Sequence, residues 1–329
     1  MISKFSFQVF LLLLSFSLNA QDIDHVSITV ADLQKSISFY KDVLSFKYTG
    51  SYTIQNRDAK MLFSIDDSLL EVVVAQLSLG DQKIELMQFK SSKPGHKIPL
   101  DSKSNDQWFQ HIAIVVADMD KAYEKLQDAK VEHVSTSPQT LPAYIKAAAG
   151  IKAFYFHDPD GHNLELIYFP KGKGNPKWQL LKGLFLGIDH TAIAVNNTDN
   201  SLPFYETIGL KVAGHSENYG TEQEHLNQVF GARLWITGLK GKSGFGVEFL
   251  DYIAPPGGRP YPADASPADM VHWHTSIKVD HLDDLYTKLK QSNYKIISDG
   301  IVSFSNQTTG ISRAVIVRDY DGHAILLFQ

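Results

Sequence analysis

Histidine recurs at one place in four similar stretches of this 329-residue chain, each of which is typical of a strand. The four are His25, His111, His190 and His274. Two glutamates lie between large aliphatic side chains in other strand-like stretches, Glu85 in residues 83–87 and Glu165 in residues 163–167. A lone carboxylate buried on such a strand is costly, and a metal ion or a raised pKa relieves that cost. These side chains therefore indicate metal chemistry.

The chain has no cysteine, which excludes disulfides, thiolate zinc sites and a cysteine nucleophile. Any metal must therefore be held by histidine and carboxylate side chains. The net charge of -5 is mild and no run of Lys or Arg occurs, so neither nucleic acid nor an anionic membrane surface is expected as a partner. With 43% hydrophobic and 20% charged residues, the composition is that of a globular protein long enough for two domains.

Residues 1–20 differ in composition from the rest of the chain. Lys4 precedes a short apolar run at residues 9–14, and Ala20 stands before Gln21. A basic start, a short apolar stretch and a small residue at the end are typical of a signal peptide. The apolar run is shorter than the ~20 residues needed to span a bilayer. The sequence therefore predicts export to the periplasm or the extracellular space, with no stable membrane insertion.

Each histidine-led stretch is followed by a pattern typical of a helix. Alternation with period two places the histidine and a small residue on one face of the strand, and bulky aliphatic residues on the other. A capping residue such as Asp32 or Asp118 then precedes apolar residues at helical spacing. Further strand-like stretches follow, as at residues 70–77 and 82–89 of the first unit. The sequence thus predicts a βαβββ unit that occurs four times.

Similar turns close the second and the fourth unit. Asp-Pro-Asp-Gly-His occupies residues 158–162, and Asp-Tyr-Asp-Gly-His occupies residues 319–323. Because this turn recurs only in every second unit, we group consecutive units in pairs. A polar stretch rich in Gly and Pro at residues 171–176 separates the two pairs. The sequence therefore predicts one domain at residues 22–170 and another at residues 184–329.

The histidine-led strand, the acid-capped helix and Asp-Pro-Asp-Gly-His-Asn-Leu-Glu-Leu at residues 158–166 together resemble the vicinal oxygen chelate superfamily. That superfamily includes glyoxalase I, extradiol dioxygenases, methylmalonyl-CoA epimerase and the fosfomycin and bleomycin resistance proteins. The resemblance implies an α+β fold in which βαβββ units pair into half-open barrels, with two such domains in this chain. It does not define the reaction, because one scaffold hosts many chemistries.

In the superfamily, the metal ligands lie on the first and last strands of each unit. For the first domain, the resemblance implies His25, Glu85, His111 and Glu165 as ligands of one divalent Zn, Ni, Mn or Fe ion. Glyoxalase I uses such a quartet to hold two vicinal oxygens of its substrate, while a coordinating glutamate moves a proton. By position, Glu165 is the first candidate for this catalytic base and Glu85 is its counterpart.

The matching positions in the second domain are His190, Glu248, His274 and Leu326. Leucine cannot bind a metal, so two interpretations stay open. The remaining two histidines and one carboxylate are compatible with non-haem iron, or the domain is a scaffold that supplies pocket walls. His272, two residues before His274, is a substitute ligand. Arg259, in an insertion rich in Pro and Gly, is a candidate contact for an anionic substrate.

The leading hypothesis is a metal-dependent enzyme of the glyoxalase I type, a lyase, isomerase or epimerase acting on a small substrate with vicinal oxygens. Export counts against glutathione adducts and favours a carbohydrate-derived or hydroxyacid substrate. An extradiol-type dioxygenase using Fe(II) is the first alternative, because His25, His111 and Glu165 match its triad. A non-catalytic ligand-binding protein of the bleomycin-resistance type is the second.

Overall fold

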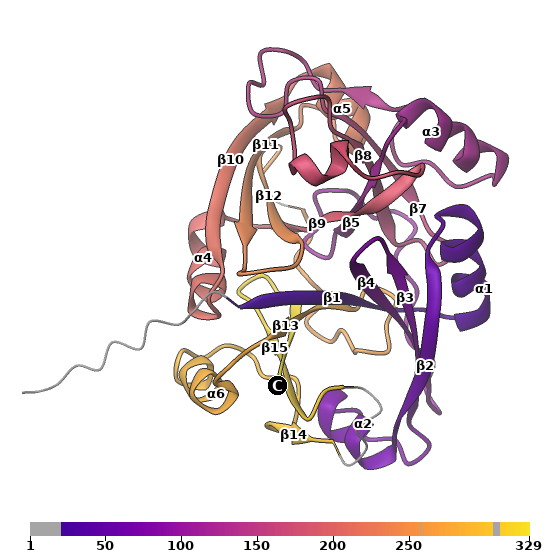
Figure 1. The fold of residues 1–329 in the computed structure, drawn as a ribbon. Coiled ribbons are helices and arrows are strands. Elements are labelled where there is room, and N and C mark those ends of the chain that lie inside the picture. Colours follow the sequence, from indigo (N-terminus) through magenta and orange to yellow (C-terminus); the bar gives the residue numbers. More distant parts are fainter. Residues whose placement is uncertain (1–20, 257, 305–309) are drawn as a thin grey trace, which may run out of the picture.

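The computed structural model describes residues 21–256, 258–304 and 310–329. They form two curved sheets of eight strands each, with helices packed around them (Figure 1). The predicted α+β fold with two half-open barrels is therefore confirmed. The predicted signal peptide at residues 1–20 lies outside the described residues and stays a prediction. Within the described part of the chain, no helix is long and apolar enough to cross a membrane.

The four units follow one another along the chain. The first contains β1 (Asp22–Thr29), α1 (Leu33–Ser38), a π-helical turn (Phe39–Val43), β2 (Lys47–Gln55), α2 (Asn56–Phe63), β3 (Glu71–Leu79) and β4 (Gln82–Lys90). The second contains β5 (Gln110–Val116), α3 (Met119–Asp128), β6 (Gln139–Thr140), β7 (Lys152–His157) and β8 (Asn163–Tyr168). After a 3-10 turn (Pro176–Gln179), the third contains β9 (Phe185–Val195), α4 (Thr198–Thr207), β10 (Lys211–Tyr219), α5 (Thr221–Asn227), β11 (Arg233–Lys240) and β12 (Gly246–Ala254). The fourth contains β13 (Trp273–Lys278), α6 (Leu282–Gln291), β14 (Val302–Ser303), β15 (Arg313–Arg318) and β16 (Ala324–Phe328).

The recurring turns predict that the first unit pairs with the second and the third with the fourth, but the sheets pair the units differently. In sheet A the strand order is β14-β15-β16-β13-β1-β4-β3-β2, so the first unit pairs with the fourth. In sheet B the order is β10-β11-β12-β9-β5-β8-β7-β6, so the second unit pairs with the third. The antiparallel pairs β1–β13 and β5–β9 form the two seams (Figure 1). The expected pairing of consecutive units is thus corrected, since each barrel draws on both residues 22–170 and residues 184–329.

Two long connections make this exchange of units possible. Residues 91–109 carry the chain from sheet A to sheet B, and residues 258–272 lie in the connection that returns it to sheet A. Arg259 joins the two, because its guanidinium forms an ion pair with Asp106 at 2.8 Å and lies over the ring of Trp108, 4.7 Å from the centroid. The guanidinium is therefore engaged in binding the connections together, and this geometry does not support the predicted contact with an anionic substrate.

Local sequence explains how the first strand and helix present the inner face of the barrel. Asp32 caps α1, since its carboxylate accepts hydrogen bonds from the backbone N–H groups of the next turn at 3.0 Å. Along β1, the side chains of Val26 and Ile28 are buried in the main hydrophobic core. Alternation then directs His25 and Ser27 to the opposite face of the strand, inside the barrel. The same pattern holds for the other histidine-led strands.

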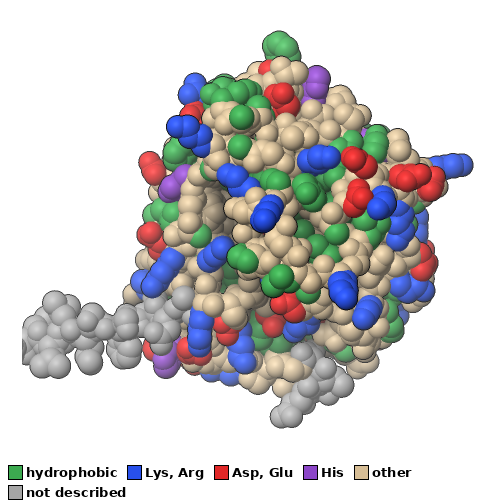
Figure 2. Space-filling view, turned by 45° about the horizontal axis from the view of Figure 1, so that its top comes forward, with side chains coloured by type: hydrophobic (Ala, Val, Ile, Leu, Met, Phe, Trp, Pro, Cys, Tyr) green, Lys and Arg blue, Asp and Glu red, His purple; other side chains and the backbone are tan. Residues whose placement is uncertain are grey.

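Charged side chains of both signs are mixed on the outer surface. On the face seen in Figure 2, Lys and Arg side chains are interspersed with Asp, Glu and hydrophobic side chains. Neither sign of charge dominates this face, which agrees with the mild net charge of -5. The chemistry that the sequence pointed to lies inside the barrels rather than on this face.

Candidate metal centre

The inner face of sheet B brings together two histidines and two glutamates from two different units. They are His111 on β5 and Glu165 on β8, from the second unit, and His190 on β9 and Glu248 on β12, from the third. All four were candidate ligands in the sequence, but they were expected in two different domains. The seam β5–β9 is what unites them.

The strand register shows why the four side chains converge. Across the seam, His111 is paired with Ala192, and Ala113 is paired with His190. The two histidines therefore lie on the same face, one diagonal step apart. Each alanine is paired with a glutamate on the strand that lies away from the seam. Ala113 is paired with Glu165 on β8, and Ala192 is paired with Glu248 on β12. The two small alanines leave room between the four functional side chains.

The ligand atoms of this group are close enough for one ion. His111, Glu165 and His190 each offer one atom, and these atoms all lie within 4.8 Å of one another. Glu165 Oε2 is 3.1 Å from His111 Nε2 and 3.5 Å from His190 Nε2. Glu248 completes the set from the other side, with its Oε2 at 3.4 Å from His190 Nε2. Glu165 is thus central, whereas Glu248 stands at the edge.

Burial differs within the set and governs the charges. The side chain of Glu165 is 6% exposed, and that of Glu248 is 31% exposed. Burial raises the pKa of Glu165, but the two imidazoles close to its carboxylate outweigh burial and lower the pKa to about 2. Burial raises the pKa of Glu248 and lowers that of His111. For His190, the nearby carboxylates outweigh burial and raise the pKa well above its usual value.

His111 has unused hydrogen-bonding capacity. Both of its ring nitrogens are buried and lack a hydrogen-bond partner among the described residues, although Nε2 lies close to Glu165. Buried polar atoms in folded proteins are almost always satisfied, so such a group needs an explanation. Two imidazoles with two carboxylates are a normal ligand set for a divalent transition metal, and a metal would bind a ring nitrogen of His111. The residues present therefore fit a metal centre.

The centre opens into a cavity of about 420 Å³. All four candidate ligands line it, together with Tyr155, whose ring centroid is 4.9 Å from that of His111. The helix α5, the strand β10 and residues 141–151 supply other parts of the wall. A cavity of this size suits a small molecule.

Sheet A contains a second centre, built around His25 and Glu85. We call it the closed centre because protein donors surround its carboxylate, although a cavity of about 200 Å³, smaller than that of sheet B, adjoins it. The histidine and the glutamate are 3.2 Å apart, from Nε2 to Oε2. Ser27 and Tyr52 donate hydroxyl hydrogen bonds to the carboxylate at 3.2 and 3.0 Å, and Gln76 donates its amide at 3.0 Å. Burial raises the pKa of Glu85, but the charge and hydrogen bond of His25, with the hydrogen bonds of Gln76 and Tyr52, outweigh burial and lower the pKa to about 2. Donors from the protein therefore already satisfy this carboxylate.

The fourth unit completes sheet A without a second carboxylate. His274 is buried, and its Nδ1 lies 3.3 Å from Nε2 of His272, so the predicted substitute ligand is paired with the histidine that it was to replace. Burial lowers the pKa of His274 to about 3. Leu326 is buried in an apolar cluster of this barrel. Among the described residues, the histidines and the glutamate of sheet A do not form a group with metal-binding spacing.

Strand register allows a position-by-position comparison of the two centres. Facing Glu85 and Glu248 on the neighbouring strands are Ser27 and Gln76 in sheet A, and Ala192 and Gly238 in sheet B. On the next strand of each sheet, Tyr52 on β2 and Ser216 on β10 occupy equivalent positions. Each donor that closes on Glu85 is thus replaced by a smaller side chain beside Glu248. The replacements open the cavity of sheet B.

The structure therefore divides the predicted quartet. His25 and Glu85 stay together in sheet A, whereas His111 and Glu165 join a histidine and a glutamate of the third unit in sheet B. Sequence reasoning found every one of these side chains but paired the units incorrectly. The pairing is a long-range property of the seams, and no local motif encodes it.

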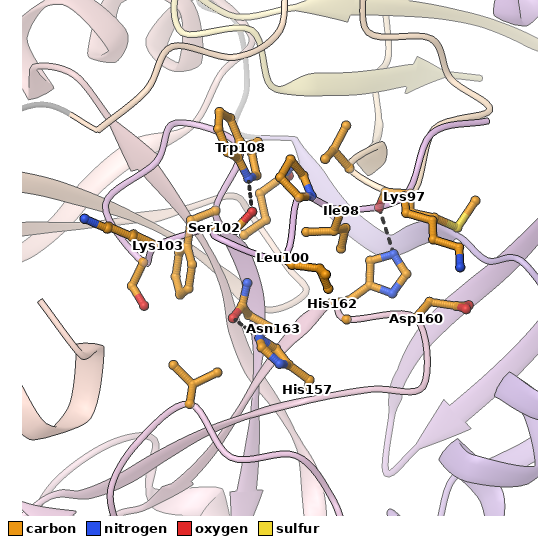
Figure 3. A pocket seen from close by; sticks show the side chains of 18 of the residues that line it. Lys97, Ile98, Leu100, Ser102, Lys103, Trp108, His157, Asp160, His162 and Asn163 are labelled. Atoms are coloured by element: carbon orange, nitrogen blue, oxygen red, sulfur yellow. Dashed lines mark hydrogen bonds between the residues drawn. The ribbon is translucent and has the colours of Figure 1, made fainter.

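A second cavity, of about 320 Å³, lies outside the metal centre (Figure 3). Several of its polar side chains are bonded to each other, since Trp108 Nε1 donates to Ser102 Oγ at 3.1 Å and His157 Nε2 lies 3.2 Å from Asn163 Oδ1. In the described part of the chain, no metal-binding group lies in this cavity. We therefore place the candidate chemistry in sheet B.

The fold is that of the half-open-barrel class, and its centre has histidine and carboxylate side chains that could hold a metal ion. A model of the Glyoxalase/Bleomycin resistance protein/Dioxygenase superfamily matches residues 22–166 and 187–327. The chain therefore belongs to this superfamily, whose members bind divalent metals and act on small molecules.

Individual relatives cover different parts of the chain. A 2-epi-5-epi-valiolone epimerase from Actinomyces sp is 30% identical over 152 residues, which are 46% of this chain and 80% of the relative. Lactoylglutathione lyase from Schizosaccharomyces pombe is 22% identical over 210 residues, 60% of this chain and 62% of the relative. The crystal structure of glyoxalase I from Zea mays superposes with a TM-score of 0.59 at 16% identity, covering 94% of this chain and 92% of that chain. That last likeness concerns the fold alone.

Proposed function

We propose that this protein is a metal-dependent enzyme that moves a proton at a carbon beside two vicinal oxygens of a small substrate. It would act as an isomerase, an epimerase or a lyase. One observation carries the proposal: His111, Glu165, His190 and Glu248 converge on the wall of one cavity of about 420 Å³. The epimerase and lyase among the relatives support the same reaction class.

His111, Glu165 and His190 would hold the ion, and Glu248 would complete the set. The unpartnered ring nitrogens of His111 and the shared carboxylate of Glu165 support this assignment. Zn, Ni, Mn and Fe all accept such ligands, so the donor set leaves the metal open among these four. When bound, a divalent ion polarises the substrate oxygens and makes the neighbouring C–H bond more acidic.

Glu248 is better suited than Glu165 to accept the proton. Its carboxylate is 31% exposed, whereas that of Glu165 is 6% exposed and lies between two imidazoles. A base must reach the substrate carbon and then return the proton, and this requires freedom of movement towards the cavity. Glu85, the other predicted base, hydrogen-bonds to side chains of sheet A and does not line this cavity. We therefore assign the proton transfer to a carboxylate oxygen of Glu248, with Glu165 as the alternative.

The fourth ligand position separates this proposal from ring-cleaving dioxygenase chemistry. A two-histidine, one-carboxylate triad suffices for non-haem iron oxygenases, which need open positions for oxygen and substrate. Here a second carboxylate, Glu248, lies 3.4 Å from His190 and favours the glyoxalase type of centre. A purely ligand-binding protein would not need this set of four ionisable groups in a cavity.

Metal analysis of matched variants tests the centre. Purified wild-type protein is expected to contain about one equivalent of a divalent transition metal, and His190→Ala should lose most of it. His25→Ala changes the equivalent histidine of sheet A and should keep the metal. Full metal content in His190→Ala, or equal losses in both variants, would contradict the assignment.

Proton transfer is tested without knowing the natural substrate. The metal-loaded protein is incubated in D₂O with a panel of α-hydroxyketones, and NMR follows the loss of the proton at the carbon beside the carbonyl group. Exchange that exceeds the background and disappears in His190→Ala supports the proposed reaction. Consumption of dioxygen with catechols, without any exchange, would replace it with ring cleavage.

A further inference from the structure

We propose that Gln223 forms a subsite for a substrate hydroxyl group, so that the substrate is a polyhydroxylated ketone or aldehyde rather than a simple hydroxyketone. This inference rests on the proposed function, because it concerns the same cavity. Gln223 lies on α5 and lines the cavity together with the four candidate ligands. It is 2% exposed, and its Oε1 is buried without a hydrogen-bond partner among the described residues.

A chain of buried side chains fixes this amide. The Nε2 group of Gln223 donates to the side-chain oxygen of Asn227, whose Nδ2 group in turn donates to the hydroxyl of Tyr252. Asn227 is 1% exposed and Tyr252 is 5% exposed. Because Nε2 is committed to Asn227, Oε1 is the amide atom left without a partner at this wall of the cavity. A carbonyl oxygen of this kind accepts a hydrogen bond, and a hydroxyl group is the donor that a carbohydrate-like substrate carries.

The fold itself does not require these polar side chains. Sheet A has apolar residues at the same places, as α2 and α5 show when they are aligned on their left-handed terminal residues, Ser64 and Gln228. The equivalents of Gln223, Asn227 and Tyr252 are Ala59, Phe63 and Phe89. There the two phenylalanines pack edge to face with their ring centroids 4.9 Å apart. A buried and unsatisfied acceptor destabilises a protein, and the equivalent place in sheet A has the apolar Ala59, so the amide of Gln223 indicates a ligand.

A neighbouring position shows the same change from an apolar to a polar residue. Asn218 is 4% exposed and lines the cavity, whereas its equivalent in sheet A, Ile54, belongs to the apolar cluster. Ser216 donates to Asn218 at 2.5 Å and lines the cavity beside it. Leu226 and Leu234 supply apolar surface on the same wall. This mixture suits a small carbon skeleton with several hydroxyl groups, whose carbonyl end faces the metal centre.

A pair of ketones with the same skeleton tests the subsite. Erythrulose and 1-hydroxy-2-butanone share four carbons and the hydroxyketone group, and only erythrulose carries further hydroxyls. Proton exchange in D₂O and saturation-transfer NMR are measured with metal-loaded wild type and Gln223→Met, which keeps the length of the side chain without the amide. Gln127→Met, on the exposed face of α3, is the control.

Wild type and Gln127→Met should prefer erythrulose, through a lower KM. Gln223→Met should lose roughly 3- to 10-fold of that preference, as expected for one neutral hydrogen bond, while the butanone is unaffected. An unchanged preference in Gln223→Met overturns the subsite and leaves the proposed reaction standing. Selective binding of erythrulose that depends on Gln223, without any proton exchange, retains the subsite and overturns the reaction. If erythrulose binds no better than the butanone in wild type, the subsite is wrong.

Discussion

The centres of sheet A and sheet B each contain a histidine and a glutamate at equivalent positions, but the two glutamates differ in exposure and in hydrogen bonding. His25 with Glu85, and His190 with Glu248, occupy equivalent strand positions. In sheet A, three side chains donate to the glutamate, which is 8% exposed, whereas in sheet B the glutamate is 31% exposed and lines the larger of the two cavities. Ligand residues alone therefore do not make a site. The residues around them decide whether the carboxylate is available.

The other unit of each barrel, the fourth in sheet A and the second in sheet B, shows a similar contrast. Leu326 and Glu165 are the last-strand residues that face the histidine pair of each barrel. Leu326 packs in an apolar cluster with Phe63 and Phe328, and the cavity beside His25 and Glu85, about 200 Å³, is smaller than that of sheet B. A filled interior stabilises the fold, whereas an open polar cavity costs free energy that a ligand can recover. The two barrels thus differ in packing: one has an apolar cluster around Leu326, and the other has carboxylates on the wall of the larger cavity.

The largest expected effect separates the two equivalent glutamates. Glu248→Gln, reloaded with metal, should slow proton exchange by roughly 10²–10⁴-fold, because the amide cannot act as a base. Glu85→Gln should stay within a few-fold of wild type, since Glu85 does not line the cavity. The measurement is the exchange rate of an active hydroxyketone in D₂O. If Glu165→Gln, and not Glu248→Gln, gives the large loss at full metal content, the base is Glu165.

A pH dependence should mark the closed centre. Burial lowers the pKa of His25, but Glu85 and Asp24 outweigh it and raise it from 6.5 to about 9. The stabilisation is therefore fully present below pH 6.5, and it is lost as the pH rises through about 9. At 1.36 kcal/mol per pKa unit, the loss amounts to at most about 3 kcal/mol. Urea unfolding between pH 6.5 and 9.5 should show a decline that is clearly weaker in His25→Gln. Equal slopes for both proteins would contradict the ion pair.

A carboxylate placed in the closed centre should not be enough to bind metal. Leu326→Glu restores the missing residue type, but Tyr52, Gln76 and Ser27 still occupy Glu85. We expect no second metal equivalent and a loss of about 2 kcal/mol in the free energy of unfolding, from a charged group in an apolar cluster. Combining it with Ser27→Ala, Tyr52→Ser and Gln76→Gly copies the open centre and should add metal. A second equivalent in Leu326→Glu alone would show that the donors do not close the site.

The smallest effect concerns one hydrogen bond. Tyr52→Phe removes the hydroxyl that donates to Glu85 at 3.0 Å and leaves a buried acceptor with fewer partners. The free energy of unfolding should fall by about 1 kcal/mol, as measured by urea denaturation. Ser216→Ala, at the equivalent place in the open barrel, should change it by less than about 0.5 kcal/mol. Equal effects of the two substitutions would mean that both centres rely on this position for stability.

The sequence by itself determined the repeating unit and the ligand positions. Strand alternation, helix capping and the turn at residues 158–162 depend on neighbouring residues, so local patterns suffice to predict them. The loss of a carboxylate at Leu326 was also visible, and it implied that only one complete quartet could form. Neither the donors around Glu85 nor the polar chain from Gln223 to Tyr252 had a local signal, because both depend on contacts between separate strands and helices.

Only the tertiary structure decided which quartet forms. Because Leu326 lies in the fourth unit, the second unit completes a quartet whether its partner is the first unit or the third. Both partners offer a histidine and a glutamate at the same places, and both seams would form the same kind of antiparallel ladder. The connections between the sheets and the side chains packed across the seams select the partner, and these contacts join residues far apart in sequence. The open centre therefore has His190 and Glu248 instead of His25 and Glu85.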